Sequence, residues 1–218
     1  HWGVWWGCAA SAAICAGLAL TAPWWARHPA SPAPPASLPR PLSGRGWAAL
    51  IAILLVAGAF RWEHLGLSLY NDEAQCFRRY VAGQNVLQPD GTVTWRPVEW
   101  WETIWLNKVA NNSMPCSIAG KFSYDLWRKL SGAPVGTVNE RAVRFPVMVA
   151  AVAGLVMLWA LARRLLPESG ACWWVLVLAT LHPWHMRYSS EGRGHGFLLL
   201  TVPLCFWFLK RALDDDRW

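Results

Sequence analysis

Charged residues are scarce in this sequence, because Asp, Glu, Lys and Arg together make up only 15% of its 218 residues. A soluble domain normally carries about a quarter charged residues. The formal net charge of +7 comes from basic residues that lie singly or in pairs at the ends of apolar runs and form no basic stripe. This distribution argues against a nucleic-acid-binding protein and is typical of the positively charged flanks of membrane spans.

Two further absences limit the chemistry that we expect. The sequence contains no Gly-rich loop of the kind that cradles nucleotide phosphates, and its six cysteines show no metal-type spacing. What is abundant is apolar: 55% of the residues are hydrophobic and 18 are Trp. Long apolar runs together with many Trp residues indicate an integral membrane protein whose tryptophans lie at the level of the lipid headgroups.

Five apolar segments predict an all-α integral membrane protein with about five transmembrane helices. None carries an acidic or basic residue at its centre, which disfavours a transporter or channel. Small residues at four-residue spacing, such as Ala150 and Gly154, would allow close helix packing. The segments are residues 2–25, 46–62, 146–166, 171–184 and 196–209.

The basic residues predict how these spans are oriented. Residues 27–45 are rich in Pro, contain Arg but no acid, and are expected to form an extended linker on the cytoplasmic side. Arg163, Arg164, Lys210 and Arg211 then fall on the same side. Residues 63–145 therefore form a long outer loop, on the periplasmic side if the membrane is a bacterial inner (cytoplasmic) membrane.

The outer loop contains several local signals. The stretches FRRYVAG and VEWWETIWLNKV suit amphipathic helices lying in the membrane interface, DLWRKLSG reads as the end of a helix stopped by Gly, and QPDGT reads as a turn. An ordinary aqueous loop is the alternative, which the many Trp residues disfavour. By this division the chain has an additional N-terminal span (1–26), a linker (27–45), a transmembrane module (46–211) and a short tail (212–218).

Asp72 and Glu73 are adjacent carboxylates that follow the second span closely. A carboxylate that is partly desolvated near lipid can act as a general base toward a hydroxyl group, and a pair can hold a divalent metal ion. The alternative is that Asp72 caps the helix that begins after it. Taken alone, the pair favours capping.

A second candidate cluster lies in the stretch between the last two spans. Its arginines, Arg187 and Arg193, together with Glu191, could bind a lipid-linked phosphate through bidentate hydrogen bonds, or contact ordinary headgroups. His182, His185 and His195 lie in the same stretch but give only a weak metal signal.

Two basic residues of the outer loop lie on the side of the membrane where positive charge is not expected. Arg141 and Arg144 precede the third span on the side opposite to the other basic flanks, so we expect each to have a partner, either an acid of the outer loop or a phosphate.

Cys76 and Cys116 lie in the same loop and are candidates for a disulfide in an oxidising compartment, or else are two unpaired thiols. The remaining cysteines, in or beside apolar spans, are expected to be inert.

Taken in order, these motifs resemble the membrane glycosyltransferases of the C-type (GT-C) fold, in particular the branch of protein O-mannosyltransferases and lipid A aminoarabinose transferases. The shared features are an Asp-Glu pair in the first outer loop, a step from a small residue to Pro that leads into a helix ending in Gly, an Arg-x-Pro entry to the next span, and a Pro followed by Tyr-Ser-x-Glu-x-Arg. In this chain they are LYNDEA, NNSMP to LSG, RFP, and HPWHMRYSSEGR, and the resemblance covers about residues 46–211.

The resemblance implies an activity and roles for the candidate residues. Asp72 would be the general base that deprotonates the acceptor, and Glu73 its neighbour in binding the acceptor or a metal. Arg193, with Arg187, Glu191 and Arg144, would bind the phosphate of a polyprenyl-phosphate-linked sugar.

Two departures from the family pattern favour a second interpretation. Asn111, Asn112 and Ser113 stand where the family usually has an acidic or His residue, and the family continues through further spans, so these residues correspond to the N-terminal part of the family module. The alternative function is therefore a noncatalytic transmembrane subunit derived from such an enzyme, whose partners are membrane lipids and other membrane proteins. We place the enzyme first, because a scaffold has no evident use for Asp72 and Arg193.

Overall fold

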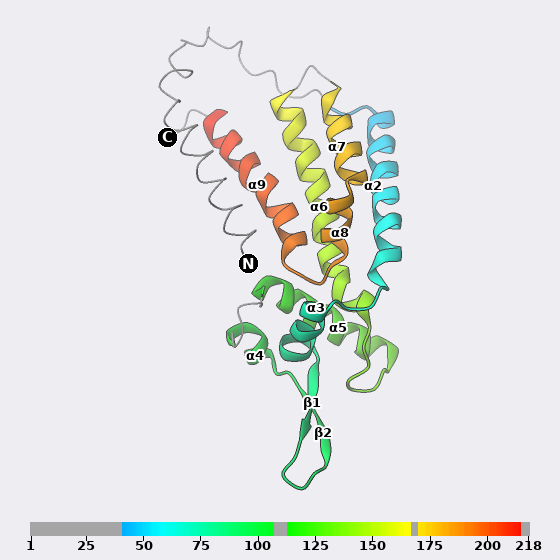
Figure 1. The fold of residues 1–218 in the computed structure, drawn as a ribbon. Helices are drawn as coiled ribbons and strands as arrows, with labels where there is room; N and C mark the ends of the chain where they lie inside the picture. Colours follow the sequence, from blue (N-terminus) through cyan, green and yellow to red (C-terminus); the bar gives the residue numbers. More distant parts are fainter. Residues whose placement is uncertain (1–40, 107–112, 167–169, 215–218) are drawn as a thin grey trace, which may run out of the picture. The chain divides into compact units, whose positions relative to one another are not determined.

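The computed structural model describes residues 41–106, 113–166 and 170–214. A helical bundle stands above a smaller part made of short helices and one β-hairpin (Figure 1). The expected first span and most of the Pro-rich linker lie outside the described residues. The bundle consists of α2 (Gly44–Leu65), α6 (Glu140–Leu165), α7 (Ala171–Leu181), α8 (Pro183–Ser190) and α9 (His195–Asp214).

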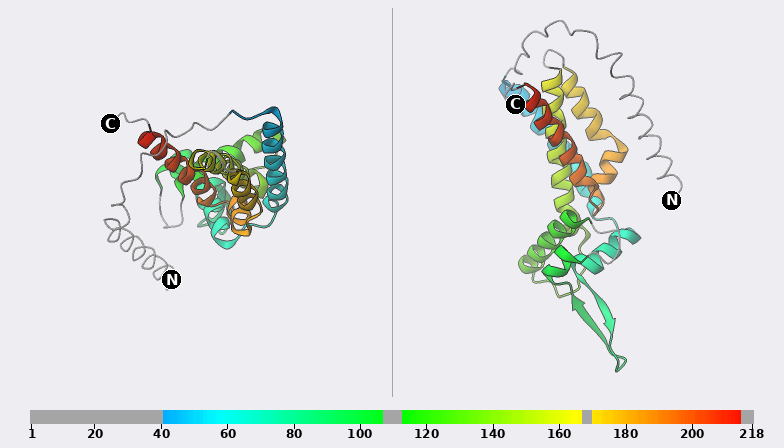
Figure 2. Two further views of the ribbon diagram at one scale, coloured as in Figure 1. Left: turned by 90° about the horizontal axis from the view of Figure 1, so that it is seen from above. Right: turned by 90° about the vertical axis from the view of Figure 1, so that its left-hand side faces the viewer.

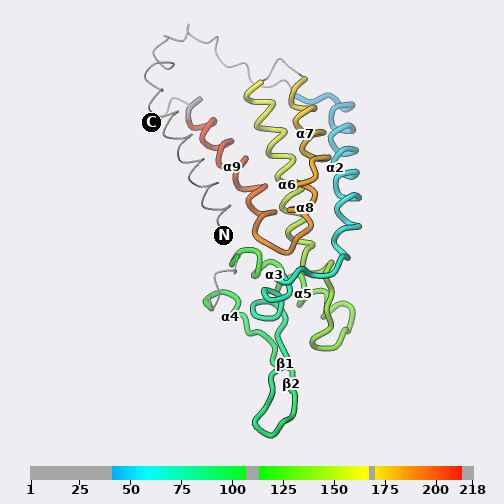
Figure 3. The backbone as a smooth tube through the Cα atoms, viewed as in Figure 1, coloured from blue at the N-terminus to red at the C-terminus, as the bar shows by residue number. Residues whose placement is uncertain are grey.

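The apolar composition of the bundle agrees with a membrane protein, but not every expected span is one long helix. In the described ranges, α2 and α6 are long and apolar enough to cross a bilayer. A third crossing is counted if α8 and α9, between which the chain bends by 117°, form one bent span. The expected fourth span is broken, because Pro183 cannot continue α7, an apolar helix of 11 residues. The backbone tube shows α8 continuing along the course of α7 before the chain turns into α9 (Figure 3).

The basic flanks lie together, as the sequence predicts. Arg45 at the start of α2, Arg163 and Arg164 at the end of α6, and Arg211 near the end of α9 all come from the end of the bundle away from the hairpin (Figure 1). Ser43 caps α2 by accepting a hydrogen bond from the Gly46 N–H at 3.2 Å, and Asn139 caps α6 through the Ala142 N–H at 3.0 Å.

Helices α6 and α9 approach closely because glycine lies at their contact. A Cβ atom at Gly154 of α6 would collide with the backbone of Leu199 and Leu200 of α9, and one at Gly196 would collide with the backbone of Val147. The predicted small-residue packing of the third span is therefore confirmed at Gly154. This contact positions the start of α9 at His195, two residues after the candidate residue Arg193.

We expect Gly154→Val to lower the free energy of unfolding by about 1–3 kcal/mol, because the added side chain must push two backbones apart. The matched control is Gly58→Ala in α2, where an added Cβ meets nothing within 4 Å and the gain in helix propensity makes the change neutral or slightly stabilising. Thermal unfolding of the full chain in detergent measures both. Equal unfolding temperatures for the two variants would show that the α6–α9 contact is not tight.

The smaller part comprises α3 (Asn71–Cys76), a π-helix η1 (Phe77–Val81), strands β1 (Gly83–Leu87) and β2 (Val93–Pro97), α4 (Trp100–Trp105) and α5 (Met114–Ser131). Helix α5 ends at Gly132 in a left-handed conformation (φ 67°), which confirms the predicted glycine stop. The predicted turn at QPDGT is also present, but the antiparallel hairpin around it, which pairs Gly83 with Pro97 and Leu87 with Val93, was not expected. The right-hand view of Figure 2 shows this hairpin projecting away from the bundle.

Candidate functional site

The candidate residues meet where the bundle joins the smaller part. Helix α3 supplies Asp72 and Glu73, the first turns of α6 supply Arg144, and the turn between α8 and α9 supplies Gly192 and Arg193. Residues that are more than a hundred positions apart in the sequence are therefore brought into contact. The structure gives them two different environments.

Glu73 and Arg144 form a fully buried ion pair, with both side chains only 1% exposed. Arg144 donates from Nε and Nη2 to the two carboxylate oxygens at 3.1 and 2.7 Å. The backbone N–H of Tyr70 donates to Glu73 at 2.9 Å, and that of Gly192 also donates to it. A charged pair with this many hydrogen bonds fixes the α8–α9 turn onto α3.

This arrangement corrects the roles expected for the two residues. The remaining N–H groups of Arg144 donate to the backbone carbonyls of Leu65, Leu67 and Ser68, so all five of its donors are used inside the protein. Arg144 therefore has no donor left for a lipid phosphate, and the carboxylate of Glu73 is not accessible to an acceptor. Of the two explanations for Arg144, the outer-loop acid is the one that the structure shows.

Asp72, in contrast, is accessible. Its Oδ2 atom accepts from Nη2 of Arg193 at 3.0 Å, and the two side chains are 52% and 37% exposed. It lies inside α3 and does not cap it; the carboxylate that reaches back to the N-terminal backbone is Glu73. The capping alternative for Asp72 is therefore wrong.

Asp72 and Arg193 line a cavity of about 470 Å³, which we call the Asp72 cavity. Ser113 and His195 add polar groups to its wall. Pro115 and the α9 side chains Phe197 and Leu198 make another part of the wall apolar. The cavity therefore places a carboxylate and a guanidinium beside a surface suited to a hydrocarbon chain.

Two cysteines also line this cavity, and of the two alternatives that the sequence left open they do not form the disulfide. Cys76 and Cys116 are free thiols, and Sγ of Cys76 lies 3.4 Å from Oγ of Ser117. Burial raises the pKa of the Cys76 thiol and raises that of Cys116 to about 12. Both thiols are therefore protonated at neutral pH and poorly reactive, which agrees with the alternative of two unpaired cysteines.

Arg187 and Glu191 lie outside the Asp72 cavity. Nε of Arg187 donates to Glu191 at 2.7 Å, and its guanidinium group lies over the rings of Tyr70 and Trp184. They border a second cavity of about 270 Å³, mostly apolar, between the end of α2 and α8. Arg144 borders this cavity and Gly192 borders the Asp72 cavity, so the buried ion pair separates the two.

The carboxylate pair does not present two ligands to one cation. Asp72 and Glu73 are each engaged by a different guanidinium group. In the ranges that the structure describes, no three His, Cys, Asp or Glu side chains are placed to hold a metal ion.

Sequence reasoning missed Arg61, which is completely buried near the end of α2. Its guanidinium group donates to Oγ of Ser189 at 2.8 Å, to the carbonyl of Thr180 at 3.2 Å and to Nδ1 of His185 at 3.1 Å. Since a guanidinium only donates, His185 carries its proton on Nε2. Arg61 therefore holds α7 and α8 together across their break, and an arginine inside the apolar run AFRW was the available signal.

The apolar helical bundle, with a polar cavity at one end, agrees with an integral membrane protein. A family model described as dolichyl-phosphate-mannose-protein mannosyltransferase matches residues 127–218, from the end of α5 through α6–α9. The resemblance predicted from the motifs is confirmed over this region, which contains Arg187, Glu191 and Arg193 but not Asp72. No curated protein and no solved structure matches the chain.

Proposed function

We propose that the chain transfers a sugar from a polyprenyl-phosphate donor to an acceptor hydroxyl group, with the reaction in the Asp72 cavity. The observation that carries this proposal is the accessible pair of Asp72 and Arg193, 3.0 Å apart, in a cavity with an apolar wall on α9. The family match, over the part of the chain that supplies Arg193, supports the same class of reaction.

In this proposal Asp72 acts on the attacking hydroxyl group and Arg193 on the leaving phosphate of one displacement reaction. Asp72 takes the proton of the acceptor hydroxyl, whose oxygen attacks the anomeric carbon of the donor. The bond from that carbon to the phosphate oxygen breaks, and polyprenyl phosphate leaves with the bonding electrons. Arg193 stabilises the negative charge that grows on the phosphate.

The direct contact between Asp72 and Arg193 gives this mechanism an order of events. A donor phosphate would compete with the Asp72 carboxylate for the guanidinium of Arg193, because bidentate phosphate pairing is at least as favourable. Binding of the donor would thus free Asp72 to act as a base. Phe197, Leu198 and Thr201 of α9 line the same cavity and would contact the first prenyl units.

Arg187 and Glu191 take a secondary role in this proposal. Because they border the second cavity, we assign the leaving phosphate to Arg193 and propose that Arg187 contacts lipid headgroups or a donor approaching from that side. The basic flanks at the other end of the bundle favour placing the Asp72 cavity on the outer side of the membrane.

We expect Arg193→Gln to slow the release of polyprenyl phosphate by about 10²–10³-fold, because one preorganised charge on the leaving group is lost. The assay uses the full chain in lipid nanodiscs with polyprenyl-phosphate mannose, and follows both sugar transfer and hydrolysis by mass spectrometry. The control is Arg141→Gln, whose guanidinium lies over Trp62 and lines none of the cavities described above; it should change the rate little.

The alternative function, a noncatalytic subunit, has a distinct outcome in the same assay. A folded chain that releases no polyprenyl phosphate from any lipid-linked sugar, alone or with its native membrane partners, would favour that alternative. Release that is equal in the Arg193→Gln variant and the wild type would mean that the site is elsewhere.

A further inference from the structure

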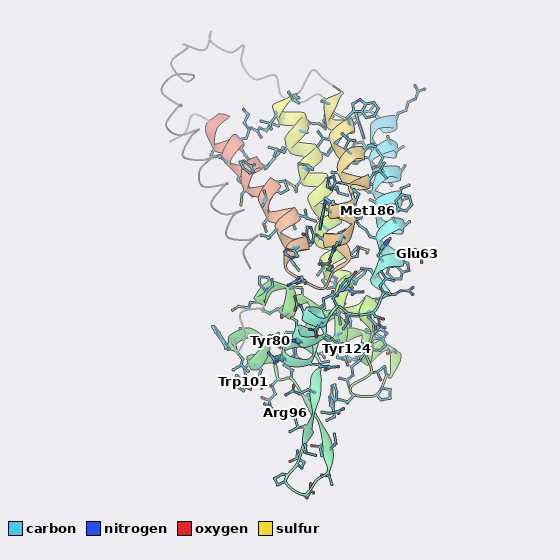
Figure 4. All side chains as sticks on the ribbon, in the orientation of Figure 1. Glu63, Tyr80, Arg96, Trp101, Tyr124 and Met186 are labelled. Carbon is cyan, nitrogen blue, oxygen red and sulfur yellow. The ribbon has the colours of Figure 1, made fainter. Side chains whose placement is uncertain are left out.

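A third cavity, of about 300 Å³, lies in the smaller part of the protein, and among the described residues none lines both it and the Asp72 cavity. Arg78 and Arg79 come from η1, Arg96 from β2 and Glu102 from α4, and all four side chains line it. We call it the arginine cavity. Figure 4 labels Tyr80, Arg96 and Trp101 in this region, below the bundle and at the base of the hairpin.

The backbone that carries Arg78 and Arg79 is held by buried side chains. The N–H of Ala82 donates to the carbonyl of Phe77 at 2.8 Å, which is the spacing of a π-helix. Oγ1 of Thr103, fully buried, donates to the carbonyl of Tyr80 at 2.8 Å, and Nζ of Lys121 donates to that of Val81 at 3.1 Å. The cavity is thus supported from α4 and α5, and single-turn π-helices are frequent at functional sites.

Among the described residues that line the arginine cavity, Glu102 is the one acid, and its carboxylate is already hydrogen-bonded. It is 5% exposed, and it accepts from Nη2 of Arg96 at 2.7 Å and from the backbone N–H of Glu99 at 2.9 Å. Glu102 therefore orients Arg96. Among the residues that the structure describes, Arg78 and Arg79 form no ion pair, so the cavity keeps an excess of positive charge.

Three guanidinium groups and one carboxylate line this small cavity, so its net charge is positive and attracts an anion. Guanidinium groups match the oxygens of phosphate in geometry as well as charge. The volume of the cavity is at the lower end of the range for ligand sites, which suits a phosphate group with a small substituent better than a whole lipid-linked sugar. Trp101 and Trp105 of α4, 52% and 77% exposed, would suit headgroup level.

From these observations we infer that the arginine cavity is a second anion site, which binds a phosphate group carried either by a small phosphorylated compound or by an anionic phospholipid. It does not depend on the proposed transferase activity, since none of the described residues that line it belongs to the Asp72 cavity. Its ligand is held by Arg78 and Arg79, with Arg96 preset by Glu102.

The test uses the full chain in neutral detergent and two probes. Binding of inorganic phosphate is measured by calorimetry at constant ionic strength, and retention of phosphatidylglycerol against phosphatidylcholine is measured by native mass spectrometry. The variant Arg78→Gln/Arg79→Gln is compared with Arg45→Gln/Lys129→Gln, which removes two exposed cations that line none of these cavities. Arg79→Gln alone serves if the double variant does not fold.

We expect at least one probe to bind the wild type, and its affinity to fall at least tenfold in the Arg78→Gln/Arg79→Gln variant while the control variant keeps it. Binding of inorganic phosphate without selective lipid retention would identify a small phosphorylated ligand, and selective retention of phosphatidylglycerol would identify a headgroup. Failure of both probes to bind, or an equal loss in the control variant, would overturn the inference.

Discussion

Replacing Asp72 by asparagine is expected to slow sugar transfer by about 10²–10⁴-fold, which is the contribution of a positioned general base. Asparagine keeps the shape of the side chain and can still accept a hydrogen bond from Arg193, but it cannot take the acceptor proton. Stability should change little, because the pair is accessible, with Asp72 52% exposed, and exposed ion pairs contribute about 0–1 kcal/mol.

The measurement is the rate of transfer and hydrolysis with polyprenyl-phosphate mannose, together with the unfolding temperature of each variant. Asp90→Asn is the matched control, since Asp90 lies at the exposed tip of the hairpin, bonded to Thr92. An Asp72→Asn variant that keeps the wild-type rate would remove Asp72 as the base and leave the resemblance without its central residue.

Replacing the neighbouring Glu73 by glutamine is expected to affect stability and not the chemical step. It should lower the free energy of unfolding by about 3–5 kcal/mol. The change leaves the guanidinium of Arg144 buried, 1% exposed, without a counter-charge. It also weakens the acceptor for the Gly192 N–H, which connects α3 to the α8–α9 turn. Activity would fall only because less of the protein is folded.

Comparison with the double variant Glu73→Gln/Arg144→Met separates the charge from the contacts. Removing both members of a buried pair is usually far less harmful than removing one, so the double variant should regain part of the lost stability in thermal unfolding. A Glu73→Gln variant within about 1 kcal/mol of the wild type would show that water or lipid headgroups reach Arg144.

The sequence motifs predicted which residues lie together better than they predicted what each of these residues does. The order of Asp72-Glu73, Arg144 and Arg193 indicated one shared site, and the structure brings all four together. What the sequence could not show is that one carboxylate is buried and the next exposed, because consecutive residues on a helix point about 100° apart and burial depends on what packs there. The pairing of Cys76 and Cys116 likewise depends on geometry that spacing does not contain.

The sequence pattern predicted the long helices better than it predicted the hairpin or the burial of single residues. The apolar runs predicted the central parts of α2, α6 and α9, though not their exact ends, and a glycine predicted the stop of α5 at Gly132. The hairpin was missed because GQNVL and VTWRP lack the alternation of a half-buried strand: most of their side chains are exposed. The burial of Arg61 was missed because its partners, Ser189, Thr180 and His185, are more than a hundred residues away.

The projecting hairpin is a place where the protein can be labelled without changing the residues of its cavities. Within the described part of the chain its strands pair only with each other. Its turn at Asp90 and Gly91 is held by local hydrogen bonds to Gln88 and Thr92. Exposed tips of this kind accept inserted sequence readily. An epitope or a fluorescent label introduced beside Gly91 would tell which face of a living cell carries the hairpin, without touching any residue of the cavities.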